Sequence, residues 1–120
     1  MAEITIEDGM LVVTMHGADK LWALKSRLEI PMAHVRGAGT DPDFIRNERF
    51  KGIRAAGTSL PGVITAGTLR QHGDWVFWDV HDPDKAVIIE LADERYARLV
   101  VQVDDPYATT AAIIRAIAPR

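Results

Sequence analysis

The sequence predicts a mainly β (α+β) domain that ends in a single α-helix. Short runs of alternating apolar and polar residues are separated at regular intervals by turn-forming residues, a pattern typical of antiparallel sheets that curl or close. A helical pattern that begins at Asp104-Asp105-Pro106 then ends the chain. The length of 120 residues predicts one domain, residues 1–120, with a core of its own.

The N-terminal part predicts a β-hairpin followed by a short helix. Ile4–Ile6 alternates apolar and polar residues, and the Asp8-Gly9 pair that follows is typical of a two-residue hairpin turn. Met10–Met15 supplies the second strand. A short helix is predicted over Asp19–Lys25, with the aspartate as its cap. The chain becomes extended again over Leu28–Pro31, because a residue before proline avoids the helical conformation.

The middle of the chain has the weakest periodicity. Met32–Val35 predicts one helical turn, and a strand is expected to begin at Val35. Residues 39–52 predict an irregular loop that is polar and charged. A short strand over Ile53–Gly57 and a turn over Leu60–Gly62 follow it.

The second half of the chain predicts four strands and the terminal helix. Glycine, aspartate and proline occur in the turns between the strands, which are 63–69, 75–80, 86–91 and 96–103. Asp104-Asp105 supplies an N-cap to the helix, and Pro106 suits its first position. The side that packs on the sheets is predicted to hold Ile113, Ile114 and Ile117, joined by Tyr107 or Thr110 a turn or two earlier.

The predicted strand over 74–80 carries large apolar side chains on both faces. Trp75 and Phe77 point to one face and Trp78 to the other. In a small barrel one set fills the interior, so the other must be covered by the terminal helix, by the loop over 39–52 or by another subunit. A single β-bulge would exchange the faces, so the pattern leaves open which of Phe77 and Trp78 points inward.

Composition excludes several classes of site. The chain has no cysteine, which rules out disulfides, thiolate metal sites and cysteine nucleophiles and fits a cytoplasmic location. It shows neither a signal-peptide pattern nor an apolar run long enough to span a bilayer, so we expect no stable membrane insertion. No phosphate-binding glycine loop opens a helix, and we expect no cofactor.

No catalytic arrangement stands out, and we expect no enzyme activity. Gly57–Pro61 resembles a nucleophile elbow around its serine, but proline replaces the second glycine. His81 lies in a tight acidic turn, where side chains rarely converge on a metal ion. His34, beside Val35, fits a partly buried and hydrogen-bonded histidine of a β-rich core.

Charge is distributed unevenly in a chain whose net charge is −3. Residues 20–54 carry eight basic and four acidic side chains, whereas residues 74–105 carry three basic and nine acidic ones. Arg46, Arg49 and Lys51 occur among aromatic residues, so the segment 44–54 is a candidate surface for a small ligand or an anionic surface. The alternative is that its apolar residues pin the loop to the barrel. We expect no nucleic-acid binding, because the protein as a whole is acidic.

Four groups of residues resemble the bacterial PH-like domain family, and together they cover nearly the whole chain. The groups are Leu21-Trp22-Ala23-Leu24-Lys25 with Leu28-Glu29-Ile30-Pro31 and His34-Val35; Gly57-Thr58 with Leu60-Pro61-Gly62 and Ala66-Gly67-Thr68; Phe77-Trp78-Asp79-Val80 with Ala86-Val87-Ile88-Ile89-Glu90-Leu91; and Tyr96-Ala97-Arg98-Leu99-Val100 with Val103-Asp104-Asp105-Pro106. The resemblance implies a PH-like barrel of two near-orthogonal antiparallel sheets, about seven strands, capped by the C-terminal helix. It implies no shared catalytic residue.

The same resemblance bears on function. Phosphoinositide-binding PH domains carry basic residues around the first hairpin loop, but here that loop is Glu7-Asp8-Gly9-Met10, whose acids would repel a phosphate. We therefore expect a non-catalytic module that binds a protein partner or another copy of itself through strand edges and the strand over 74–80. The candidate binding residues are Trp75, Phe77, Trp78, Arg46, Arg49 and Lys51.

Overall fold

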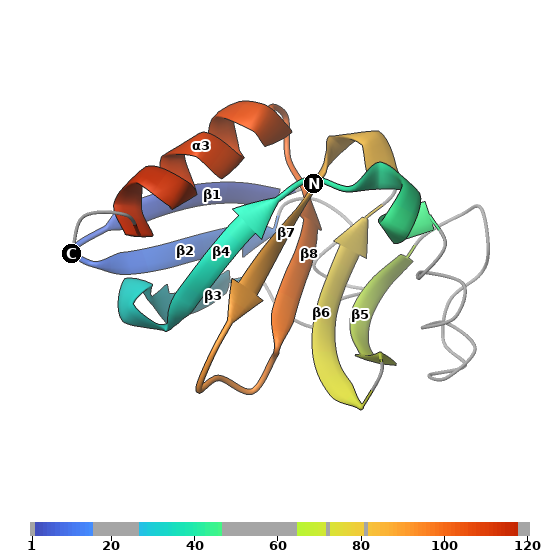
Figure 1. Cartoon of the computed structure of the whole chain (residues 1–120), viewed down its shortest axis with the longest axis horizontal. Coiled ribbons are helices and arrows are strands. Elements are labelled where there is room, and N and C mark those ends of the chain that lie inside the picture. Colours follow the sequence, from blue (N-terminus) through green and yellow to red (C-terminus); the bar gives the residue numbers. More distant parts are fainter. Residues whose placement is uncertain (1, 16–26, 47–64, 72, 81, 118–120) are drawn as a thin grey trace.

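Two β-sheets and a C-terminal helix are the main elements of the described part of the chain. The computed structural model describes residues 2–15, 27–46, 65–71, 73–80 and 82–117. Strands β1, β2 and β3 form the smaller sheet, and five strands in the order β4-β7-β8-β6-β5 form the larger one (Figure 1). The prediction of a mainly β fold with a terminal helix is confirmed, with eight described strands where about seven were expected.

The smaller sheet is an antiparallel meander that begins with the predicted hairpin. β1 (Ala2–Glu7) and β2 (Met10–Met15) pair along their whole length and leave Asp8 and Gly9 as the two loop residues. Both loop residues have positive φ, +52° and +76°, as a type I′ turn requires. β3 (Arg27–Pro31) pairs with the other side of β2.

A sharp corner carries the chain from the smaller sheet to the larger one. The 3₁₀ turn η1 (Met32–His34) follows β3 directly, and β4 (Val35–Gly39) begins at the next residue. The backbone N–H of Met32 donates to the carbonyl oxygen of Gly9 at 2.9 Å, which ties this corner to the first hairpin. The predicted helical turn and the strand that begins at Val35 are therefore confirmed.

The larger sheet contains one parallel pair, which corrects the expectation of purely antiparallel sheets. Its strands are β4, β5 (Thr65–Gln71), β6 (Asp74–Val80), β7 (Ala86–Leu91) and β8 (Arg98–Gln102). β6 pairs with β8 in parallel, and the other neighbours are antiparallel. The reason is topological. The chain reverses between β6 and β7 and again between β7 and β8, and β8 then lies between the two earlier strands, so it runs in the direction of β6 (Figure 1).

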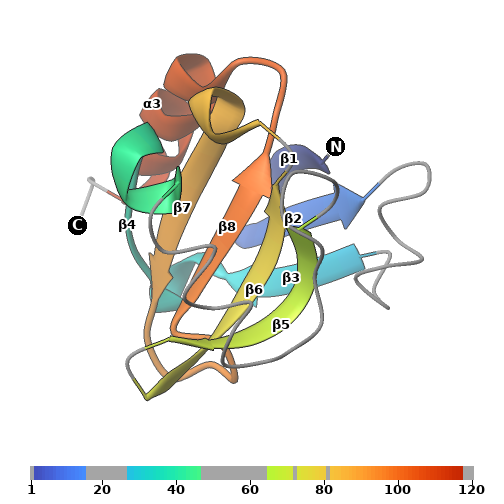
Figure 2. The same ribbon diagram turned by 90° about the vertical axis from the view of Figure 1, so that its right-hand side faces the viewer.

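The two sheets do not close into a barrel, and the prediction of a closed barrel is wrong. In Figure 2 the strands of the smaller sheet run across those of the larger sheet. Within the described residues no strand of one sheet pairs with a strand of the other, so β1 and β3 are edges of the smaller sheet and β4 and β5 are edges of the larger one. Closure requires hydrogen bonds between edges, whereas here the chain passes from sheet to sheet through η1.

The terminal helix α3 (Pro106–Ile117) packs against β4, β7 and η1. Asp105 caps it as predicted, because its carboxylate accepts a hydrogen bond from the backbone N–H of Ala108 at 3.1 Å. Ile113 is completely buried in the core, but Ile114 is 46% exposed. The prediction that both isoleucines face the sheets is therefore wrong for Ile114, since successive helical residues are turned by about 100°. Tyr107, one of two residues expected to join that side, is also exposed.

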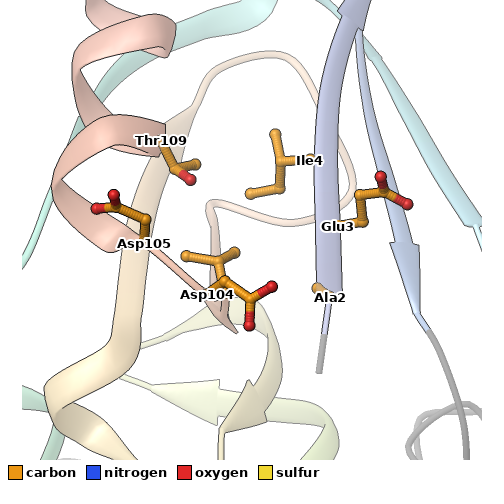
Figure 3. A pocket seen from close by; sticks show the side chains of 7 residues that line it. Ala2, Glu3, Ile4, Asp104, Asp105 and Thr109 are labelled. Atoms are coloured by element: carbon orange, nitrogen blue, oxygen red, sulfur yellow. The ribbon is translucent and has the colours of Figure 1, made fainter.

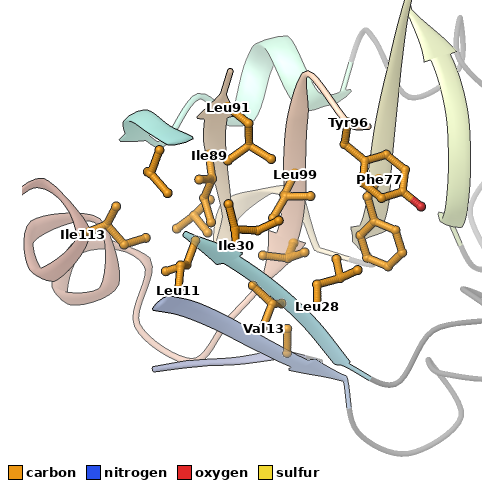
Figure 4. Close-up of a cluster of buried hydrophobic side chains, with 14 of the residues drawn as sticks. Leu11, Val13, Leu28, Ile30, Phe77, Ile89, Leu91, Tyr96, Leu99 and Ile113 are labelled. Carbon is orange, nitrogen blue, oxygen red and sulfur yellow. The ribbon is translucent and has the colours of Figure 1, made fainter. Parts of the chain in front are cut away.

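The main core fills the space between the two sheets and α3. Phe77 lies in it and meets the ring of Tyr96 edge-on, with ring centroids 5.7 Å apart (Figure 4). The aliphatic part comes from both sheets and from the helix: Leu11, Val13, Leu28, Ile30, Val35, Val87, Ile89, Leu91, Leu99, Val101 and Ile113. The alternation expected for half-buried strands thus selects the inward-facing residues.

A short helical segment interrupts the region expected to be an irregular loop. Residues 42–46 are helical, and they begin with a local signal that the sequence carries. The Asp41 carboxylate accepts a hydrogen bond from the backbone N–H of Phe44, and Pro42 stands at the first helical position. The predicted helix over 19–25, strand over 53–57 and turn over 60–62 lie outside the described residues.

Candidate functional site

Strand β6 buries aromatic side chains on both of its faces. Phe77 belongs to the main core, whereas Trp78 belongs to a second cluster on the opposite face of the larger sheet. We call this second group the Trp78 cluster. Its buried members are Ile45, Val76, Trp78, Val80, Ala86 and Val100, and Phe44 and Ile88 pack against it.

The cover over Trp78 comes from within the chain. Ile45, in the helical segment 42–46, is completely buried in the Trp78 cluster, and Phe44 is partly buried against it. The sequence left three candidates to cover this face of β6: the terminal helix, the loop over 39–52 and another subunit. The structure shows that residues of the loop over 39–52 do so. Neither Phe77 nor Trp78 has exposed surface, so neither offers a contact to a partner in this conformation.

Trp75 is the aromatic residue of β6 that reaches the surface. It points to the same face as Phe77, two residues nearer the start of the strand, and 43% of it is exposed. Its backbone is held firmly, because the carbonyl oxygen of Trp75 accepts a hydrogen bond from the N–H of Ala97 at 2.8 Å. Trp75 thus presents a half-exposed indole on a strand that pairs with β5 on one side and with β8 on the other.

The Arg46 side chain joins the helical segment 42–46 to the turn after β6. Its guanidinium lies 3.0 Å from an Asp43 oxygen and 2.6 Å from an oxygen of Asp84, which belongs to the 3₁₀ turn η2 (Pro83–Lys85). Two carboxylates therefore compensate this cation. Arg49 and Lys51, the other predicted basic contacts, lie outside the described residues.

His34 is partly buried and hydrogen-bonded, as the sequence predicts, and its contacts join two turns. Its Nδ1 is 2.5 Å from a carboxylate oxygen of Glu94, and both side chains are partly buried. The carbonyl oxygen of His34 also accepts a hydrogen bond from the backbone N–H of Ala92 at 2.9 Å. These contacts hold η1 against the turn between β7 and β8, which is a structural role.

A cavity of about 470 Å³ lies between β1 and the start of α3. Its lining residues are Ala2, Glu3, Ile4, Val103, Asp104, Asp105 and Thr109 (Figure 3). Figure 3 shows that the carboxylates do not converge: Glu3 and Ile4 leave β1 on opposite sides, and the Asp105 side chain turns away from β1. Within the described residues, no group of three or more acidic, histidine or cysteine side chains is placed to hold a metal ion.

The outer side of α3 was not singled out from the sequence as a candidate surface. Tyr107 is 75% exposed and Ile114 is 46% exposed, and both lie on this one helix. Their spacing of seven residues could have indicated a shared face. This exposed face was missed because Ile113 and Ile114, which are adjacent, were both assigned to the same side of the helix.

Comparisons with protein-family models, with curated proteins and with solved structures found no match to this chain. Among the described residues, no helix is long and apolar enough to cross a membrane.

Proposed function

We propose that this chain is a non-catalytic, PH-like interaction module that acts by protein–protein contact, with another protein or with a second copy of itself. Two sheets whose strands cross, followed by a helix that packs on the core, support the PH-like part of the proposal. The parallel β6–β8 pair departs from it. A cytoplasmic location belongs to the same proposal, because a chain without cysteine needs no oxidising compartment.

The exposure of Trp75 is the observation that carries the proposal. Tryptophan is among the residues that contribute most to binding at protein interfaces, because it buries a large apolar area with few rotatable bonds. The side chains at Val76, Phe77 and Trp78 are completely buried, yet Trp75 on the same strand stays 43% exposed. Its attachment to a paired strand limits the conformational entropy that a partner must remove on binding.

Site-specific photocrosslinking in the cells that make the protein tests this proposal. A benzophenone amino acid replaces Trp75 in one variant and Glu29, an exposed residue on β3, in the control. We expect a discrete crosslinked product from position 75 and none from position 29, and mass spectrometry of the product separates a second copy from another protein. If position 75 gives no product beyond that of position 29, the proposal fails.

The rival function, binding of a small ligand or an anionic surface through segment 44–54, has less support. Arg46 already lies in ion pairs with Asp43 and Asp84. Ile45 belongs to the Trp78 cluster, and Phe44 packs against it. Binding to anionic vesicles that disappears in an Arg46→Ala/Arg49→Ala variant and in added salt would favour this rival over protein contact.

A further inference from the structure

The outer side of α3 carries an apolar stripe. Tyr107, Ala111 and Ile114 follow each other at intervals of four and three residues, so they lie above one another on one side of the helix. Tyr107 and Ile114 are exposed, whereas their neighbours Pro106 and Ile113, turned by about 100° around the helix axis, are buried. The stripe therefore faces away from the core.

Opposite charges stand at the two ends of this stripe. Asp104 and Asp105 are exposed at the start of α3, and Arg115 is exposed in its last turn. Each charge suits the helix dipole at its own end. A second helix with the same sequence would match this pattern only if it ran in the opposite direction.

We propose that α3 is a self-association surface, which pairs antiparallel with α3 of a second copy around a two-fold axis. This inference rests on the proposed function, in which the domain acts by protein contact. When Tyr107 lies opposite Ile114 of the second copy, symmetry makes the reciprocal contact as well. The same register sets Arg115 level with Pro106 along the helix axis, next to the exposed Asp104 and Asp105 of the second copy.

Charge and size argue for a second copy and for reversible association. A parallel pair would set acids against acids and Arg115 against Arg115, whereas the antiparallel pair compensates both ends. Ala108 and Ala111 are small enough to let the helices approach closely. A helix of 12 residues is about 18 Å long. Such a pair buries less than the roughly 1,200 Å² of a standard interface, so association depends on concentration.

Sedimentation equilibrium of the full chain at low salt, over a range of protein concentrations, tests the surface. Ile114→Glu places a charge in the stripe, and Ile6→Glu makes the same change at another exposed isoleucine, on β1. We expect Ile114→Glu to raise the dissociation constant at least about tenfold, which corresponds to about 1.4 kcal/mol. Ile6→Glu leaves it unchanged. Circular dichroism confirms that both variants fold.

A charge exchange tests the antiparallel arrangement. Arg115→Glu alone and Asp104→Lys alone each place like charges at both ends of the pair, so each variant should stay monomeric. In a pair formed from one copy of each variant, the native Asp104 and Arg115 meet at one end and the two substituted residues, also of opposite charge, meet at the other. Both ends therefore attract. We expect the mixture to associate where neither variant does.

Three results would overturn the inference: a wild-type chain that is monomeric at every concentration, equal effects of Ile114→Glu and Ile6→Glu, or a mixture that does not associate. None of these results depends on the photocrosslink at position 75. A crosslink that persists would leave the proposed function standing on another surface, whereas its loss would remove the proposed function independently of α3.

Discussion

Phe77 and Trp78 are neighbours on β6, and both are completely buried, but they lie in different hydrophobic clusters on opposite faces of the larger sheet. The smaller sheet and α3 cover the face of Phe77, and the helical segment 42–46 contributes to the cover over Trp78. The larger sheet is thus the middle layer of this region, and Phe77 and Trp78 serve packing. Trp75, on the same strand, is the aromatic residue that reaches the surface.

Replacement of Trp78 is expected to destabilise the fold. Trp78→Ala removes a completely buried ring and should lower the free energy of unfolding by about 3–5 kcal/mol, the range for large-to-small changes in a core. Trp75→Ala, at a position 43% exposed, should cost about 1 kcal/mol or less. Urea denaturation of the two variants measures both values. Equal losses would show that the two indoles do not differ in burial.

The cover of the Trp78 cluster can be tested at two consecutive residues. Ile45→Ala opens a cavity beside Trp78 and should cost about 2–5 kcal/mol. Arg46→Ala breaks two ion pairs on an exposed side chain and should cost no more than about 1 kcal/mol. Thermal unfolding ranks the variants, and a red shift of tryptophan emission in Ile45→Ala would report water near Trp78. A larger loss of stability in Arg46→Ala than in Ile45→Ala would contradict the assignment of Ile45 as a cover of Trp78.

The first hairpin turn depends on a backbone conformation that favours glycine. Gly9 has φ of +76°, and a Cβ added there would meet no atom within 4 Å, so the cost of Gly9→Ala is backbone strain alone. We expect a loss of about 1–2 kcal/mol in the free energy of unfolding. Gly37→Ala is the matched control, since Gly37 has no positive φ and has the same open space. A loss at Gly37 as large as at Gly9 would refute the conformational argument.

The parts that could be predicted from the sequence are those with local causes. Asp8-Gly9 determines a hairpin turn through the φ values of two residues, and Asp105 determines the start of α3 through one side-chain hydrogen bond. Alternation along β6 likewise separates Phe77 from Trp78 without any partner strand. Asp41-Pro42 was also a local signal for the helical segment 42–46. It was overlooked because the residues around it are charged and predicted a loop.

The sequence by itself determined a mainly β chain, its first hairpin, the corner at Met32–His34 and the capped terminal helix, because neighbouring residues alone favour each of these. Only the tertiary structure decided that the sheets stay open, that β8 runs parallel to β6 and that Ile45 covers Trp78. The tertiary structure also decided the contacts between His34 and Glu94 and between Arg46 and Asp84. Such pairs join residues 38 or 60 positions apart, and no local preference specifies which distant segment comes to lie against them.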